Sequence, residues 1–430
     1  MGRGPELLSG ADVEVLKNPE VPLSDAFRGF IGESTGVLTF TLSGFELTLP
    51  LREGVLLNLL NLPPWRKGTL ETPWSGSFDR GGITEPNFEP TCSLARPVAS
   101  AVSIPEAWAR RGAMKRRSIG RSVLSVAPLA FGGNVFGWTV DEAMAFRLLD
   151  TFVDSGFNLI DTADTYSTWV PGHQGGESET ILGRWLRARG RRSDVVIATK
   201  VGMEMPSGKG LDRSHIRASI TASLARLQTD HVDLYQSHVD DLGTPIEETL
   251  ETYERLIAEG KTRAIGASNF TTERLTAALE ASQSHGWPRY ECLQPRYNLL
   301  DRDAYEGALE ATCRSAGLGV ITHSSLAKGY LSGKYRSEVD FQKLPHGPAA
   351  ARRSTGRGRR VVSALELVAK RLEVPMSTVA IAWIVGRPTV TAAIASATTV
   401  VQLEELMAGA RLELDAASRK ELDVASAGSG

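Results

Sequence analysis

Four side chains suited to carbonyl chemistry each follow an apolar run in this sequence. Asp161 and Tyr166 lie in the string DTADTY, directly after the run FNLI. Lys200 closes the run VVIATK, and His238 closes VDLYQSH. Because the carboxyl ends of parallel strands meet at one edge of a sheet, a parallel α/β fold would bring these four groups together. The combination predicts a site for proton-coupled carbonyl chemistry.

The expected roles follow from acid–base chemistry. Reducing a carbonyl requires a hydride donor and an acid that protonates the forming alkoxide. Tyr166 can supply this proton, although a free tyrosine has a pKa of about 10 and is a weak acid unless its phenolate is stabilised. Lys200 can stabilise the phenolate, and Asp161 can hold the ammonium by a charge-assisted hydrogen bond. His238 is expected to orient the carbonyl oxygen.

Each of these residues, taken alone, has an ordinary structural explanation. An aspartate after a strand is often a helix cap, and a lysine or histidine at a strand end is usually solvated. The prediction of a site therefore depends on all four residues occurring together, each at the end of a strand.

The segments that must position these residues alternate regularly from Met114 onward. Short β-branched runs are followed by amphipathic stretches, which is typical of repeated βα units. The count of eight predicts a (β/α)₈ barrel, and two short runs in KRRSIGRSVLSVA predict a β-hairpin that closes its bottom. The predicted strands are PLAFGG, FNLID, VVIATK, VDLYQSH, TRAIGAS, YECLQP, LGVITH and TAAIAS.

Two regions depart from this pattern. Residues 1–113 lack sustained pairing of strands and helices, and we interpret them as an N-terminal extension that is disordered or results from a wrongly assigned start before Met114. The barrel is then expected over residues 114–425. Residues 328–360 are too long for an ordinary βα connection and rich in Gly, Pro and Arg. We expect a loop that grips a cofactor.

The composition excludes several classes of protein. A net charge of -2 gives no broad attraction for nucleic acid or an anionic membrane. Only three cysteines occur, without CxxC spacing, which argues against a disulfide framework or a zinc site. No apolar stretch approaches the roughly 20 residues of a membrane helix. We expect a cytoplasmic protein without a metal, nucleic-acid or membrane partner, whose oligomeric state stays open.

From Met114 to about Leu412 the chain resembles the aldo-keto reductase family, to which the β-subunits of potassium channels are related. The resemblance is carried by MKRRSIGRSVLSVAPLAFGG, DTADTY, DLYQSH, GKTRAIGASNF, LQPRYNLLDR, SLAKGYLSGKY and IASATTVVQLEEL. It implies a (β/α)₈ barrel that reduces an aldehyde or ketone with NADPH. It also implies a catalytic tetrad of Asp161, Tyr166, Lys200 and His238, with Tyr166 as the acid.

The resemblance further implies an extended cofactor site without a Rossmann domain, and no GxGxxG occurs in the sequence. Ser268, Asn269 and Gln294 are expected to hold the nicotinamide carboxamide. The expected pyrophosphate path is Ser324, Leu326, Lys328 and Gly329, and the expected adenosine and 2'-phosphate set is Ser396, Ala397, Thr398, Gln402 and Glu405.

This chain departs from the family pattern at two places. His323 stands where the family usually stacks a tyrosine on the nicotinamide, and a core histidine is the alternative reading. The segment SATTVVQ lacks the lysine or arginine that many members place near the 2'-phosphate. NADPH is therefore the expected cofactor with NADH left open, and the arginines of residues 352–360 are candidates for that phosphate.

Two other functions are compatible with the barrel. One is a regulatory or sensor protein that binds cofactor but turns over little. The other is a (β/α)₈ lyase or isomerase, for which metal or phosphate motifs such as HExxH or Walker A would be expected and are absent from the sequence. The substrate is not readable from the pattern, because pockets in this fold are built from loops. We expect the loops around Trp138, Trp169 and the segment after Leu331 to form it.

Overall fold

The computed structural model describes residues 36–42, 45–51 and 115–428, apart from residues 336, 344 and 345. The chain divides into two units, Met1–Glu106 and Ala107–Gly430. The described part of the first unit is one antiparallel hairpin, in which β1 (Gly36–Leu42) pairs with β2 (Phe45–Leu51). The rest of residues 1–113 lies outside the described residues, so the expectation of an N-terminal extension stays a prediction.

The second unit contains a closed barrel of eight parallel strands. Neighbouring strands are consecutive in the sequence, and β12 pairs with β5 to close the barrel. The predicted (β/α)₈ fold and all eight predicted strands are confirmed. The strands are β5 (Leu129–Gly132), β6 (Leu159–Asp161), β7 (Val196–Val201), β8 (Val232–Ser237), β9 (Thr262–Ser268), β10 (Tyr290–Gln294), β11 (Gly319–Thr322) and β12 (Val390–Ala395).

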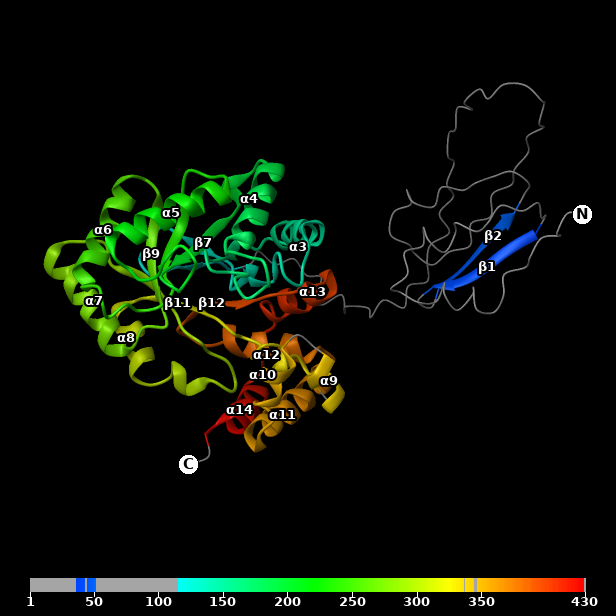
Figure 1. The fold of residues 1–430 in the computed structure, drawn as a ribbon. Coiled ribbons are helices and arrows are strands. Elements are labelled where there is room, and N and C mark those ends of the chain that lie inside the picture. The colour runs from blue at the N-terminus through cyan, green and yellow to red at the C-terminus, as the bar shows by residue number, and fades with distance from the viewer. Residues whose placement is uncertain (1–35, 43–44, 52–114, 336, 344–345, 429–430) are drawn as a thin grey trace, which may run out of the picture. The chain divides into compact units, whose positions relative to one another are not determined.

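Helices surround the barrel and connect its strands (Figure 1). Local signals match their ends: the Asp212 carboxylate accepts hydrogen bonds from the first turn of α5, and Gly190 ends α4 with a left-handed φ of 67°. The longer helices are α3 (Glu142–Asp154), α4 (Glu177–Arg189), α5 (Arg213–Leu227), α6 (Ile246–Ala258), α7 (Thr272–His285), α8 (Ala308–Ala316), α11 (Gly356–Leu372), α12 (Met376–Val385), α13 (Val400–Gly409) and α14 (Ala416–Ser426).

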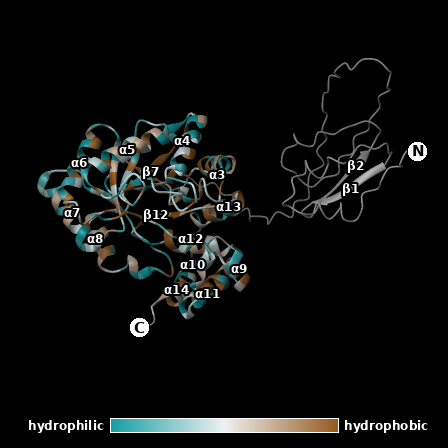
Figure 2. Ribbon diagram, in the orientation of Figure 1, coloured by the Kyte–Doolittle hydropathy of each residue, from teal (hydrophilic) through white to brown (hydrophobic). Residues whose placement is uncertain are grey.

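The core has two layers. Inside the barrel, small and branched side chains such as Ala198, Leu234 and Ile321 form one buried cluster. A larger cluster fills the space between the strands and the outer helices. Figure 2 shows the matching pattern, with hydrophobic residues along β12 and alternating hydrophilic and hydrophobic residues on α7 and α8. This burial on both faces explains why the strands read as nearly continuous apolar runs.

The predicted hairpin is present as β3 (Arg117–Ser118) and β4 (Ser125–Val126). Ile119 and Leu124 belong to the buried cluster inside the barrel. Arg117 Nη1 donates to the carbonyl of Val390, the first residue of β12, at 2.7 Å. The hairpin therefore closes the end where the strands begin, opposite to the end that carries Asp161 and Lys200.

The segment from 328 to 360 is more helical than the sequence suggested. It contains the 3₁₀ turn η6 (Tyr330–Ser332), α9 (Glu338–Lys343), α10 (Gly347–Ala351) and the first turns of α11. The expected long loop is therefore wrong as a description of its backbone. Over the described residues, no helix is long and apolar enough to cross a membrane, and no group of three His, Cys, Asp or Glu side chains is placed to hold a metal ion.

Candidate active site

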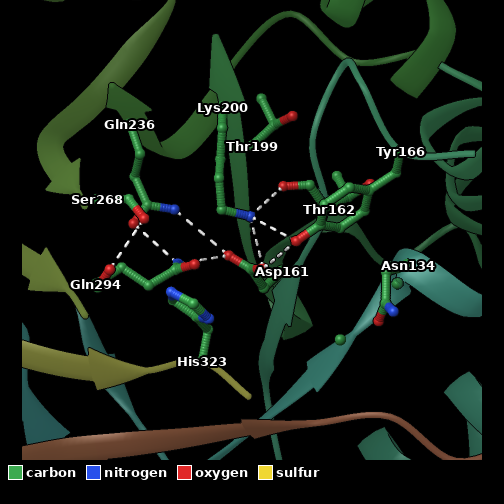
Figure 3. Close-up of polar contacts among 12 residues, drawn as sticks. Asn134, Asp161, Thr162, Tyr166, Thr199, Lys200, Gln236, Ser268, Gln294 and His323 are labelled. Carbon is green, nitrogen blue, oxygen red and sulfur yellow. Dashed lines mark hydrogen bonds and ion pairs between the residues drawn. The ribbon is translucent and has the colours of Figure 1, made fainter. Parts of the chain in front are cut away.

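Asp161, Tyr166 and Lys200 form one hydrogen-bonded group where β6 and β7 end (Figure 3). Lys200 Nζ lies 2.7 Å from Asp161 Oδ2 and 3.0 Å from Tyr166 Oη. Tyr166 Oη also lies 3.2 Å from Asp161 Oδ2. The side chains of Lys200 and Asp161 are 0% and 1% exposed. A buried ammonium thus has a carboxylate on one side and a phenol on the other, as the residue types predicted.

The turn after β6 brings Tyr166 to this group. The backbone N–H of Thr162 donates to the carbonyl of Ala198 and continues the pairing with β7. Ser167 has a left-handed φ of 77°, and its hydroxyl donates to the carbonyl of Phe136 at 2.9 Å. This bond holds the turn against the loop that follows β5, and the phenol next to Ser167 points at Lys200 (Figure 3).

His238 lies beside the phenol, directly after β8. Its ring centroid is 6.0 Å from that of Tyr166, with the two rings nearly perpendicular. Its backbone carbonyl accepts a hydrogen bond from Asn269 Nδ2 at 2.9 Å. Nδ1 of His238 is buried and has no hydrogen-bond partner among the described residues. The four predicted catalytic residues are therefore brought together, with the imidazole beside the phenol.

Burial and charge set the protonation of this group. Burial raises the pKa of Tyr166 to about 12, although the Lys200 ammonium acts in the opposite direction. Burial opposes the charge of Lys200, but Asp161 and Tyr166 outweigh it and the lysine pKa is raised. Burial, together with the Lys200 charge, holds the pKa of His238 well below its usual range. At neutral pH the site contains a protonated phenol, an ammonium and a neutral imidazole.

The residues expected at the nicotinamide lie where β9, β10 and β11 end. Ser268 Oγ donates to the carbonyl of Gln294 at 2.9 Å, and Asn269 Nδ2 lies 3.1 Å from Ser268 Oγ. His323 Nε2 lies 3.2 Å from Asn269 Oδ1. Gln294 Nε2 donates to Asp161 Oδ1 at 2.9 Å. These four side chains supply the amide, hydroxyl and planar groups that a nicotinamide carboxamide requires, and Gln294 links them to Asp161.

The expected pyrophosphate path has an unusual backbone. Ser324, Ala327 and Lys328 have φ angles of 59°, 50° and 57°, and Gly329 has 86°. Inside this loop, the N–H of Ala327 donates to the carbonyl of Ser324 and the N–H of Gly329 to the carbonyl of Leu326. Lys334, which the sequence analysis missed, extends over Gly329: a Cβ on this glycine would lie 2.5 Å from Lys334 Cε. Two lysines therefore accompany this loop, which suits a diphosphate.

The expected adenosine set follows β12. Ser396 Oγ lies 2.7 Å from the carbonyl of Gly132 and 2.6 Å from Asn134 Oδ1, and Asn134 is a further polar neighbour that the sequence analysis missed. Thr398 donates from its backbone N–H and its hydroxyl to Gln402 Oε1. Glu405 accepts from Ser377 Oγ on α12 at 2.6 Å. Ala397 is 1% exposed.

The arginines proposed as 2'-phosphate ligands make other contacts. Arg353 pairs with Asp301 at 2.9 Å. Arg357 donates to the carbonyl of Ser426 at 2.7 Å. Arg359 donates to the carbonyl of Ser354 at 2.8 Å. These contacts argue against the sequence-based interpretation of these three residues.

A row of aromatic rings leads outward from the phenol. Tyr166 and Trp169 have ring centroids 6.2 Å apart, Trp169 and Trp138 5.8 Å, and Trp138 and His346 5.2 Å. These rings come from the loops after β5 and β6 and from the start of α10, as expected for a pocket made of loops. Trp169 is 48% exposed, so this row reaches the surface.

Comparison with known proteins agrees with this geometry. Residues 128–427 match the model of the aldo/keto reductase family. The chain is 35% identical over 312 residues to the uncharacterized oxidoreductase YrpG of Bacillus subtilis (strain 168), covering 70% of this chain and 93% of that protein. It is 31% identical over 309 residues to the aldo-keto reductase YhdN of the same organism, covering 70% and 89%.

A third relative is named as a channel subunit and not as an oxidoreductase or reductase. The chain is 35% identical over 303 residues to a probable voltage-gated potassium channel subunit beta of Arabidopsis thaliana, covering 68% of this chain and 90% of that protein. The resemblance drawn from the motifs is thereby confirmed over the whole barrel. The chain belongs to the aldo/keto reductase family.

Proposed function

We propose that the protein reduces an aldehyde or ketone to an alcohol with NADPH, and that Tyr166 donates the proton. The observation that carries this proposal is the contact of one buried ammonium with both a phenol and a carboxylate: Lys200 Nζ lies 3.0 Å from Tyr166 Oη and 2.7 Å from Asp161 Oδ2. This arrangement lets a phenol give up a proton in a site that excludes water, because the charge left behind is compensated.

The chain's own residues would act as follows. The carbonyl oxygen is received between Tyr166 Oη and the neutral imidazole of His238. The phenol proton moves to the oxygen as the carbon is reduced, and the phenolate is held by Lys200 until solvent returns a proton. Asp161 keeps the ammonium in place throughout. When bound, the dinucleotide supplies the hydride.

The residues present fit that cofactor. Ser268, Asn269 and Gln294 would hold its carboxamide, and His323 would lie against its ring. The loop from Ser324 to Gly329, with Lys328 and Lys334, would hold the diphosphate. Preference for NADPH over NADH is part of the proposal and rests on the family resemblance. We also propose a cytoplasmic location, which the low cysteine content favours.

The test is steady-state oxidation of NADPH and NADH with a panel of aldehydes and ketones. Tyr166→Phe is expected to bind cofactor like the parent and to lose most turnover, on the order of a hundredfold or more for loss of a general acid. Unchanged turnover in this variant would refute the assignment of Tyr166. Cofactor binding is followed separately by fluorescence.

The alternative is a regulatory protein with the same fold and cofactor. It is favoured by one observation, the 35% identity to a probable voltage-gated potassium channel subunit beta. The same assay separates the two functions. A sensor binds NADPH tightly and turns over very slowly with every carbonyl compound, whereas a metabolic reductase reaches ordinary turnover, about 1 per second or more, with at least one of them.

A further inference from the structure

The Asp161 carboxylate has a second set of partners that the proposed reaction does not use. Its Oδ2 faces Lys200 and Tyr166, whereas its Oδ1 faces two glutamine amides. Gln294 Nε2 lies 2.9 Å and Gln236 Nε2 3.4 Å from Oδ1. Gln294 Nε2 also lies 3.1 Å from Gln236 Oε1, which links the two amides (Figure 3). We call Gln236 and Gln294 the amide bridge.

The barrel places Gln236 for this contact. It lies opposite Lys200 in the register of β7 and β8, so both side chains point to the barrel interior. Its other register neighbour is Gly266 on β9, where a Cβ would lie 2.5 Å from Cys292 Sγ and 3.1 Å from Gln236 Cγ. The missing side chain at Gly266 therefore leaves the space that Gln236 occupies. Gln236 is 0% and Gln294 2% exposed.

The chemistry of the bridge suits an ionised carboxylate. An amide donates a hydrogen bond to Oδ1 without adding a charge, so it stabilises the carboxylate and leaves the Lys200 charge for Oδ2 and the phenol. Without Gln236, the buried Oδ1 would keep only the Gln294 donor, and the loss of one donor to a buried charge costs free energy. We propose that Gln236 is a positioning residue for carbonyl reduction, which acts through Asp161 by holding its ionised carboxylate in the orientation that Lys200 requires. This inference rests on the function proposed above.

Gln236 can be replaced without removing a predicted cofactor ligand, whereas Gln294 cannot. Gln294 is a predicted carboxamide ligand, so its replacement changes cofactor binding and the bridge together. Gln236 belongs to no predicted cofactor set, and the hydrogen bonds that its side chain makes among the described residues go to Asp161, Gln294 and Cys292. Substitutions at Gln236 therefore change the bridge without removing a predicted cofactor ligand.

The experiment compares Gln236→Leu with Ser237→Ala. Ser237 is the next residue on β8, is equally buried, and bonds the hydroxyls of Tyr253 and Tyr290 on the outer face. Gln236→Leu is expected to lower kcat about tenfold or more, as for loss of a hydrogen bond to a charged group, with the Kd for NADPH within about twofold. The KM for the carbonyl substrate should stay within about twofold, so that the loss falls on kcat, as for a residue that acts through Asp161.

Gln236→Glu is the second variant and keeps the inference testable if Gln236→Leu does not fold. A protonated glutamic acid donates to Oδ1 as glutamine does, whereas the ionised form repels Asp161. Its turnover relative to the parent should rise toward acid pH and fall toward alkaline pH. A kcat of Gln236→Leu no lower than that of Ser237→Ala would overturn the proposal. If only Gln236→Glu folds, a pH profile parallel to those of Ser237→Ala and the parent would overturn it.

A measurement without turnover separates this inference from the proposed function. The melting temperature of Gln236→Glu is expected to fall below that of the parent at neutral pH and to approach it at acid pH, where the introduced carboxyl takes a proton and can donate to Oδ1 as the amide does. Ser237→Ala should lose a similar amount at every pH. An equal loss at every pH in Gln236→Glu argues against the bridge, whatever the substrate is. Absent turnover in the parent, with the melting pattern intact, would instead remove the proposed function.

Discussion

Lys200 and Asp161 form an ion pair, with Nζ 2.7 Å from Oδ2, whose two side chains are almost completely excluded from solvent. A buried ion pair gains little over an apolar pair of the same shape, because both charges lose their hydration. Breaking it by removing one partner is costly, since the other charge is left alone. Both partners of the pair must therefore be present for the folded state to be stable, and not only for the proposed reaction.

The first prediction concerns this pair. Lys200→Met and Asp161→Asn should each lower the free energy of unfolding by about 3–5 kcal/mol, and the double variant should lose less than the sum. Urea unfolding of the three variants measures this. Additive losses would mean that the two charges do not depend on each other. Turnover should be lost in all three variants, because Lys200→Met removes the charge that compensates the phenolate and Asp161→Asn removes the carboxylate that holds this charge in place.

A second prediction concerns pH. Burial holds the pKa of His238 well below its usual range and raises the pKa of Tyr166 to about 12. Neither group should then titrate near neutrality, so kcat for reduction should be flat between about pH 6 and 9. The measurement is a kcat profile for the parent and His238→Gln. An inflection near the ordinary pKa of histidine that disappears in His238→Gln contradicts the neutral imidazole.

Much of this site was predictable from the sequence, because its reactive side chains lie where the predicted strands end. Asp161 and Lys200 each close an apolar run, and in a parallel barrel every strand ends at the same rim. The hairpin around Gly120 was equally predictable from two short runs flanking a turn. Local rules sufficed here, since the same residues determine the element and the position of the side chain.

Other features depend on packing between distant segments. Gln236 lies within VDLYQSH like any polar strand residue, and its contact with Asp161 depends on the space that Gly266 leaves. Residues 328–360 read as a loop because Gly and Pro are poor helix formers, yet α9 and α10 form there. Lys334 follows Gly333 in a turn, and no periodic pattern indicates that it covers Gly329.

A third prediction concerns Asp164, whose carboxylate is buried in the turn after β6. Neither oxygen makes a hydrogen bond of normal geometry with the described residues. Burial, and then the charge of Glu179, raise the pKa of Asp164 to about 7, with the Thr165 amide and the charges of Arg226 and Lys200 offsetting this only in part.

The direction in which stability changes with pH follows from proton binding by Asp164. The folded state keeps the Asp164 proton to higher pH than the unfolded state, whose ordinary value is 3.8, so stability falls as the pH rises from about 4 to about 7. Asp164→Asn should raise the melting temperature above pH 7 and leave it nearly unchanged at pH 4. A gain of equal size at both values would point to a cause other than titration.

A fourth prediction concerns the aromatic row. Trp138 contacts both Trp169 and His346, so it holds the outer part of the row together. Trp138→Ala should lower kcat/KM about tenfold for an aromatic aldehyde, which loses ring contacts, and much less for a short aliphatic aldehyde. The ratio of kcat/KM for the two substrates is the measurement. An equal fall for both would mean that the row supports the fold rather than the substrate.

The last prediction distinguishes between two roles for Lys334, binding of the diphosphate and binding of the 2'-phosphate. Lys334 extends over Gly329 on the proposed diphosphate path, and the diphosphate is common to NADPH and NADH, whereas the segment from Ser396 to Gln402 carries no cation. Lys334→Met should therefore weaken NADPH and NADH by the same factor, about fivefold to tenfold for one charged contact. Thr398→Arg should strengthen the binding of NADPH alone.

Fluorescence titration gives the Kd values of both cofactors for each variant. Lys370→Met, which replaces an exposed lysine on α11, is the control. A selective loss of NADPH in Lys334→Met would place this lysine at the 2'-phosphate and remove the need for a cation after β12.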